Sequence, residues 1–222
     1  LALMGPLGVV GVVTGAADRV VIDASGPFDA LDGHLVVDAD DLAVLGDRYG
    51  GVRLDANLRD GATALRHEAT RKRGGSFEVC TRLDAQQRFV EPDAACRGVI
   101  VRDLALDNMA MLRGASGAPL AGGTVNVAVA PEGSLSQLSA SGAVRLAQGW
   151  LAGAFIGMGE VRLSPLPGGK VGLHGSLLQG NVTFDATMST SAPYETVLTA
   201  RFDGLDLDAF LPELASRYGA RA

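Results

Sequence analysis

Hydrophobic and polar residues alternate along much of the chain, most regularly between Lys170 and Phe202. Three successive runs there place apolar side chains on one parity and polar side chains on the other. Their apolar members are Val171, Leu173 and Leu177; Val182, Phe184, Ala186 and Met188; and Tyr194, Leu198, Ala200 and Phe202. Successive side chains of a β-strand point to opposite faces, so each run predicts a strand with one apolar and one polar face. Gly180 and Pro193 lie where antiparallel neighbours would turn.

The same alternation recurs upstream and predicts a mainly β protein. It slips by one residue between Val101 and Leu104, which predicts a bulge or a break at Arg102-Asp103. Gly61 to Gly75 is the most polar stretch and is expected to be a long loop or a frayed edge. Further strands are expected at residues 20–24, 33–39, 52–58, 77–83, 99–106, 125–129, 134–146, 148–158 and 160–163.

The two ends of the chain depart from this pattern. Residues 1–17 carry no charge and are rich in glycine, and the run is shorter than the roughly 20 apolar residues of a membrane span. A Gly-rich strand pair is the favoured interpretation, and a truncated span is the alternative. Near the other end, Asp208 can cap a short helix in which Phe210, Leu211 and Leu214 share a face.

Composition narrows the class of protein. Hydrophobic residues make up 47% of the 222 residues but aromatic residues only 5%, so Val, Leu and Ala supply most of the apolar surface. That balance favours a wide aliphatic face. The net charge of −6 argues against a nucleic-acid partner, which would require clustered cations. The one basic cluster, formed by Arg66, Arg71, Lys72 and Arg73, is expected to be a solvated loop.

Two cysteines, Cys80 and Cys96, enclose a loop of fifteen residues. Cys80 falls on the polar parity of its strand, beside Glu78 and Arg82, although an unpaired thiol usually prefers burial. A disulfide across this loop would stabilise the fold by about 3 kcal/mol and would imply an oxidising compartment. We favour the disulfide, with two free thiols as the alternative.

The sequence offers little catalytic chemistry. It has no GxSxG elbow, no phosphate-binding GxxxxGK[ST] loop and no CxxC or HExxH pair. The three histidines, His34, His67 and His174, are far apart, and His174 is expected to be an exposed imidazole. Turn formation and helix capping account for the aspartates near residues 38–41 and 203–208. We therefore expect no enzyme activity, no cofactor and no metal site.

Two stretches resemble repeating units of TamB and AsmA-like proteins. Residues 25–42, SGPFDALDGHLVVDADDL, look like the "small-Gly…Gly-x-Leu-x-Val-x-Ala-x-x-Leu" unit of that family. Residues 202–214, FDGLDLDAFLPEL, are similar to the "Leu-Asp-Leu…Leu-Pro" segment between the repeats. The resemblance implies an elongated, curled antiparallel or mixed sheet, a β-taco-like groove, with a short C-terminal helix. Residues 1–222 would then be a single elongated β domain within a longer repeat-containing chain.

The resemblance also implies a function in cell envelope biogenesis. The chain would be a periplasmic segment of a protein anchored in the inner membrane of Gram-negative bacteria. It would move phospholipid between the inner and outer membranes, aid outer-membrane protein assembly, or both, with a BamA-type barrel protein as a further partner. An aliphatic groove would shield acyl chains from water at roughly 0.8 kcal/mol per CH₂. The expected lipid-contact wall consists of Val125, Val127, Val129, Val182, Phe184, Met188, Leu198 and Phe202.

A second hypothesis comes from a different class of protein. The chain could be a secreted or surface β-solenoid or sandwich that serves as a scaffold or adhesion module. The same apolar residues would then form a closed, dry core. Whether the apolar face is open or closed distinguishes the two hypotheses.

Overall fold

A computed structural model describes residues 2–4, 10–27, 32–44, 47–72, 74–113, 117–151, 154–192 and 194–203. These ranges are mainly β and hold three 3-10 turns, η1 (Leu106–Asn108), η2 (Ala110–Leu112) and η3 (Leu178–Gly180), but no α-helix. None of their helical segments could cross a membrane. The strands are β1 (Ala2–Met4), β2 (Val10–Ala16), β3 (Arg19–Ser25), β4 (Asp32–Ala39), β5 (Asp41–Val44), β6 (Asp47–Arg59), β7 (Ala62–Arg71), β8 (Ser76–Leu83), β9 (Gly98–Ala105), β10 (Ala121–Ser134), β11 (Gln137–Leu151), β12 (Ala154–Leu166), β13 (Lys170–Leu177), β14 (Val182–Ser189) and β15 (Thr196–Phe202).

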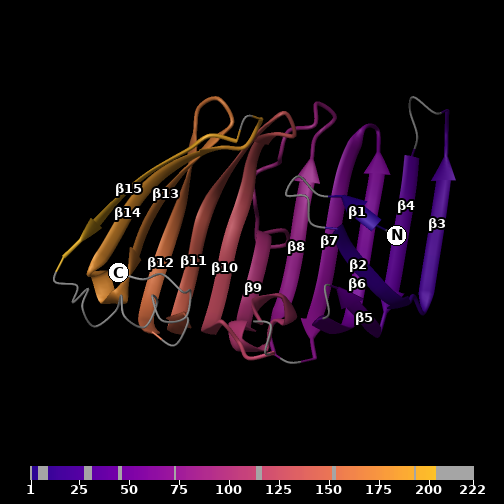
Figure 1. The fold of residues 1–222 in the computed structure, drawn as a ribbon. Coiled ribbons are helices and arrows are strands. Elements are labelled where there is room, and N and C mark those ends of the chain that lie inside the picture. Colours follow the sequence, from indigo (N-terminus) through magenta and orange to yellow (C-terminus); the bar gives the residue numbers. More distant parts are fainter. Residues whose placement is uncertain are drawn as a thin grey trace.

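All fifteen strands belong to one antiparallel sheet (Figure 1). Its long path runs β3-β4-β6-β7-β8-β9-β10-β11-β12-β13-β14-β15, so that most strands pair with their neighbours in sequence. The start of β6 pairs instead with β5, which continues the sheet through β2 to β1. β3 and β15 each have a single partner among the described strands, so the sheet is not closed.

A line of backbone irregularities crosses the sheet near one end of its strands. Register shifts interrupt the pairing of β6 with β7, of β9 with β10, of β10 with β11 and of β11 with β12. At Gly123 a Cβ atom would lie 2.7 Å from the carbonyl oxygen of Ala147, so only glycine fits there. Positive φ angles mark the line at Gly51, Asp103, Gly123, Gln148, Gly157 and Gln179.

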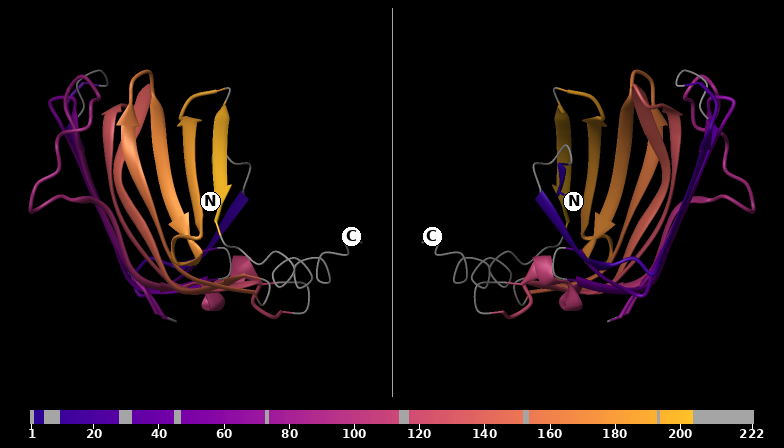
Figure 2. Two further views of the ribbon diagram at one scale, coloured as in Figure 1. Left: turned by 90° about the vertical axis from the view of Figure 1, so that its left-hand side faces the viewer. Right: turned by 90° about the vertical axis from the view of Figure 1, so that its right-hand side faces the viewer.

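This line, which we call the crease, coincides with the curvature of the sheet. Bulges bend a strand and increase its local twist, and aligned bulges in neighbouring strands bend the whole sheet. Figure 2 shows the sheet curved, with β14 and β15 on the opposite side from β6, β7 and β8. β1 and β2 lie across the concave side, in front of β6 and β7 in Figure 1. The bulge predicted at Arg102-Asp103 is confirmed and belongs to the crease.

The prediction of a loop or frayed edge at Gly61 to Gly75 is wrong. Residues Ala62–Arg71 form β7, which pairs on both sides, with β6 and with β8. The stretch looks polar because its outward parity carries Arg66 and Glu68, whose side chains form an ion pair at 2.7 Å. The inward parity still carries Leu65, His67 and Ala69, so alternation holds within a charged strand.

Other expectations have mixed outcomes. The uncharged N-terminal run forms the Gly-rich strand pair β1 and β2, as favoured. The strand expected to stop at Pro131 continues to Ser134, because β9 pairs with β10 only as far as Val129 and no donor is required beyond it. The C-terminal helix, and most of the second family-like stretch, lie outside the described residues, as does part of the first.

Candidate functional site

The register of the sheet brings the apolar parity of successive strands into continuous rows on one face. In the first row every residue is the direct cross-strand partner of the next. At about 4.8 Å between strands, the row extends for about 53 Å. Its members are Val20, Val37, Leu54, His67, Val79, Val99, Val129, Gly142, Leu163, Leu173, Ala186 and Leu198.

A second row runs parallel to the first, two residues closer to the crease along each strand. It contains Ala69, Phe77, Val101, Val127, Val144, Val161, Gly175, Phe184 and Ala200. The same face continues nearer to the crease with Val125, Val182 and Phe202. It continues on the other side of the first row, further from the crease, with Met188. All eight residues expected to form the wall therefore share one face of the sheet, which we call the apolar face.

β1 and β2 lie across the apolar face at β6 and β7, and away from the crease no other layer covers this face in the described residues (Figures 1 and 2). Every substantial backbone contact between strands is with a neighbour or next neighbour in the same sheet, and no large apolar side chain among the described residues is completely buried. Among the eight expected wall residues, Val182 is buried by its neighbours and the three valines of β10 are half-buried. Leu198 and Phe202 keep 62% and 61% of their surface exposed.

The apolar face lies on the concave side. The β8–β9 connection is attached to Cys80, which has the opposite parity, and this connection projects from the convex side (Figure 2). Conversely, η1 contacts Arg71, which has the apolar parity of β7. The concave surface is therefore aliphatic and the convex surface polar.

One part of the apolar face is closed, at the crease between β4 and β8. Ala39, Val52 and Ala69 form a small buried cluster there. Tyr49 and Phe77 pack against this cluster. Their two rings meet edge to face, with centroids 5.8 Å apart. Burial raises the pKa of the Tyr49 hydroxyl, and the nearby Asp47 carboxylate adds to that effect.

A buried ion pair stands beside this cluster. Arg71 Nη2 donates to Asp47 Oδ1 at 2.6 Å and to the Asn108 carbonyl at 2.7 Å, and the two side chains are only 1% and 6% exposed. Asp47 Oδ1 also accepts the Ala110 N–H at 3.2 Å, so the pair fixes η1 and η2 to the sheet. The expectation that Arg71 belongs to a solvated loop is wrong. In the sequence, Arg71 continues the period-two series of Leu65, His67 and Ala69, and this position could have indicated that it faces inward.

The convex face carries a network of exposed charges. Glu160 binds Arg162 at 2.6 Å and Arg145 at 3.2 Å, and these two guanidinium groups lower the pKa of its carboxyl. The imidazole of His174 is exposed, as expected, and its Nδ1 lies 2.7 Å from Asp185 Oδ1. Such solvent-exposed pairs contribute little stability, but their charged groups make this face polar and hydrated.

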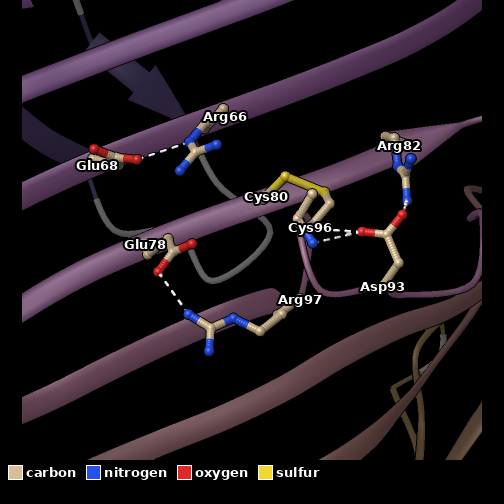
Figure 3. The surroundings of a disulfide bond; sticks show 9 residues. Arg66, Glu68, Glu78, Cys80, Arg82, Asp93, Cys96 and Arg97 are labelled. Atoms are coloured by element: carbon tan, nitrogen blue, oxygen red, sulfur yellow. Dashed lines mark hydrogen bonds and ion pairs between the residues drawn. A yellow bond between two sulfur atoms is a disulfide. The ribbon is translucent and has the colours of Figure 1, made fainter.

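A disulfide joins Cys80 to Cys96 and fixes the β8–β9 connection to the convex face (Figure 3). Asp93 supports the same turn by accepting hydrogen bonds from the backbone N–H groups of Ala95 and Cys96, at 2.8 and 2.9 Å. The other carboxylate oxygen of Asp93 accepts a hydrogen bond from Arg82 Nη2 at 2.6 Å. The hydrogen bonds from Arg82 and from the two backbone groups lower the pKa of Asp93.

The arrangement offers extensive apolar contact along the two rows. Nowhere in the described ranges do three or more His, Cys, Asp or Glu side chains gather as a metal site would require. An open hollow of about 770 Å³ lies between the ends of β3, β4 and β6. Comparison with protein-family models, curated proteins and solved structures finds no match to this chain.

Proposed function

We propose that the apolar face binds phospholipid acyl chains, and that the chain is a hydrophobic-groove segment of a TamB- or AsmA-like protein. In this proposal the concave sheet is the β-taco-like groove of that family, and it takes no part in catalysis. The observation that carries the proposal is the row of mainly aliphatic residues that continues across the twelve strands of the long path and is exposed at Val20 and Leu198. Water-exposed apolar surface on that scale requires an occupant.

The chemistry of the face suits acyl chains. The two rows are mainly Val, Leu and Ala and contain no Asp, Glu, Lys or Arg, although His67 lies in the first row. A methylene chain on this face gains roughly 0.8 kcal/mol for each CH₂ removed from water. Each strand contributes one similar apolar contact to a row, so an acyl chain is held equally well at any position along it. A lipid could therefore move along the row by exchanging equivalent contacts.

The remaining parts of the proposal rest on the family resemblance and on the disulfide. A Cys80–Cys96 bond suits the oxidising periplasm of Gram-negative bacteria. There the segment would belong to an inner-membrane-anchored protein that carries phospholipid towards the outer membrane. A contribution to outer-membrane protein assembly with a BamA-type barrel protein is part of the same proposal.

The experiment compares two adjacent substitutions on β15. Leu198→Asp places a charge on the apolar face, and Thr199→Asp places the same charge on the opposite face of the same exposed strand. The purified chain is examined by native mass spectrometry and lipid extraction, with circular dichroism as the test of folding. We expect phospholipid to co-purify with the wild type and with Thr199→Asp, and to be largely lost from Leu198→Asp.

Two results would overturn the proposal. One is a folded Leu198→Asp variant that retains the wild-type amount of lipid. The other is a lipid-free wild-type chain that also fails to extract phospholipid from vesicles. The rival hypothesis, a scaffold or adhesion module with a closed core, is not favoured, because the sheet is not closed and, away from the crease and from β1 and β2, the apolar face has no second layer among the described residues.

A further inference from the structure

The two edge strands of the sheet are unusually open. All seven residues of β15 are exposed, and so are six of the seven in β3. Both edges carry large apolar side chains in water: Ile22 is 71% exposed in β3, and Val197 is 70% exposed in β15. Each strand pairs on one side only among the described strands, so its other side presents free backbone donors and acceptors.

Neither edge has a proline, a lysine or a bulge to prevent strand addition, and the charged residues are few: Arg19 and Asp23 in β3 and Arg201 in β15. Soluble proteins block such edges with proline, bulges, lysine or a covering segment. β3 and β15 contain no proline and no lysine, and both pair with their one neighbour in unbroken register. An open, regular and apolar edge is suited to pairing with another strand.

The number of strands determines which strand fits. The path from β3 to β15 contains twelve strands joined only by antiparallel pairings, so β3 and β15 run in opposite directions. A second copy placed beside the first in the same orientation therefore brings its β3 antiparallel to β15. The alternation of strand directions then continues across the junction, and the apolar faces of the two copies stay on the same side.

The side chains of the two edges are complementary in one register. Pairing Arg19 with Asp203 places opposite charges across the junction on the convex side. The same register sets Val20 against Phe202 and Ala24 against Leu198 on the apolar face, and it covers all seven residues of β3. Shifting the register by two residues in one direction would place Arg19 against Arg201, which disfavours that alternative.

We propose that β15 of one copy pairs with β3 of a second copy in this register, joining the sheets edge to edge. The junction extends the rows described above, because Phe202 and Leu198 meet Val20 and Ala24 on the same face. The pairing is heterologous, so it leaves one β3 and one β15 free and can repeat. The proposal does not depend on what the apolar face binds.

Cysteine cross-linking tests the proposal on the full chain. The variant Val20→Cys with Phe202→Cys carries one thiol on each edge, while Cys80 and Cys96 are joined to each other and buried. Mild oxidation, or a short bismaleimide, should convert it into a ladder of dimers, trimers and larger species. The matched control, Val20→Cys with Thr199→Cys, places one thiol on the opposite face and should form far fewer cross-links.

The single variants identify other arrangements. Cross-linked dimers from Phe202→Cys alone would mean that two β15 edges pair with each other, and dimers from Val20→Cys alone would mean the same for β3. Either result would overturn the proposal. Light scattering of the unmodified chain over a wide concentration range gives the independent measurement, since a mass that stays monomeric throughout would also overturn it.

Discussion

The two halves of the sheet share one strand pattern but differ in how they are packed. Between β4 and β9 the concave side holds a buried aliphatic cluster, an edge-to-face aromatic pair and a buried ion pair. Across the convex side of the same strands lies a disulfide-bound connection. From β12 to β15 the same alternation leaves Met188, Leu198 and Phe202 exposed on the apolar face.

The difference shows that alternation specifies a strand and a face, but not whether the face is covered. Coverage near β4 to β9 comes from additional segments, η1, η2 and β5, which fold onto the crease. In the described part of the chain the second half has η3 packed against β12, but no buried ion pair and no aromatic pair. Stability should therefore concentrate in the first half, and ligand contact in the second.

The largest effect should come from the buried ion pair. Asp47→Ala leaves the Arg71 guanidinium buried without its counter-ion, which we expect to lower the free energy of unfolding by about 3–5 kcal/mol. Urea unfolding provides the measurement. The control is Glu160→Ala on the convex face, whose pairs with the exposed Arg145 and Arg162 should contribute little stability. Equal losses from both variants would contradict the contrast between the halves.

Removal of the disulfide should have the next largest effect. The double variant Cys80→Ser with Cys96→Ser frees a loop of fifteen residues, and we expect a loss of about 3 kcal/mol. Because the loop lies on the convex face, lipid binding by the surviving folded protein should be unchanged. Loss of lipid from a folded double variant would show that the two faces are coupled.

Two phenylalanines in the second row allow a matched comparison. Phe77→Ala removes a ring that packs against the Tyr49 ring and the aliphatic cluster, and should cost about 2 kcal/mol. Phe184→Ala removes a ring from the uncovered half and should cost about 1 kcal/mol, while it weakens lipid binding. Unfolding curves and lipid extraction on the same two variants test both statements. A larger loss of stability from Phe184→Ala would indicate that the second half has a covered core.

The smallest effect should be the acid sensitivity of the β8–β9 connection. Its hydrogen bonds lower the folded-state pKa of Asp93, so the stabilisation is present at neutral pH and is lost as pH falls below about 3.9 towards the folded-state pKa. Asp93→Asn should be less stable than the wild type at neutral pH. The difference should shrink as pH falls, when urea midpoints are compared across pH. A difference that is independent of pH would contradict a role for the carboxylate charge.

Much of the register was accessible from sequence because the apolar face imposes it. The parity of Val171, Leu173, Phe184 and Leu198 predicts that these side chains share a face, and the pairing of β13, β14 and β15 places them on one face. A one-residue shift in the register of a strand would move its apolar side chains onto the polar, convex face. The bulge at Arg102-Asp103 was visible for the same reason, as a break in that parity.

The covered region was harder to predict. Arg66 and Glu68 made β7 look like a loop, because their charges obscured the inward-facing Leu65, His67 and Ala69 that alternate with them. The partnership of Arg71 with Asp47 joins positions 24 residues apart, and it depends on η1 and η2 folding back onto the crease. Such long-range packing leaves no local periodic signal. The expected wall residues lie on one face, but their contact with lipid stays a prediction.

The crease also acts on strand parity in the way that an insertion acts on a reading frame. Val101 and Leu104 both face inward and are both buried, although they differ in parity, because Asp103 adds one residue between them. The strands that carry an extra residue, β6, β9, β11 and β12, thus change frame at the crease. Without the bulge in β9, simple alternation from Val101 would turn Leu104 to the convex face, so the irregularity preserves the continuity of the apolar surface.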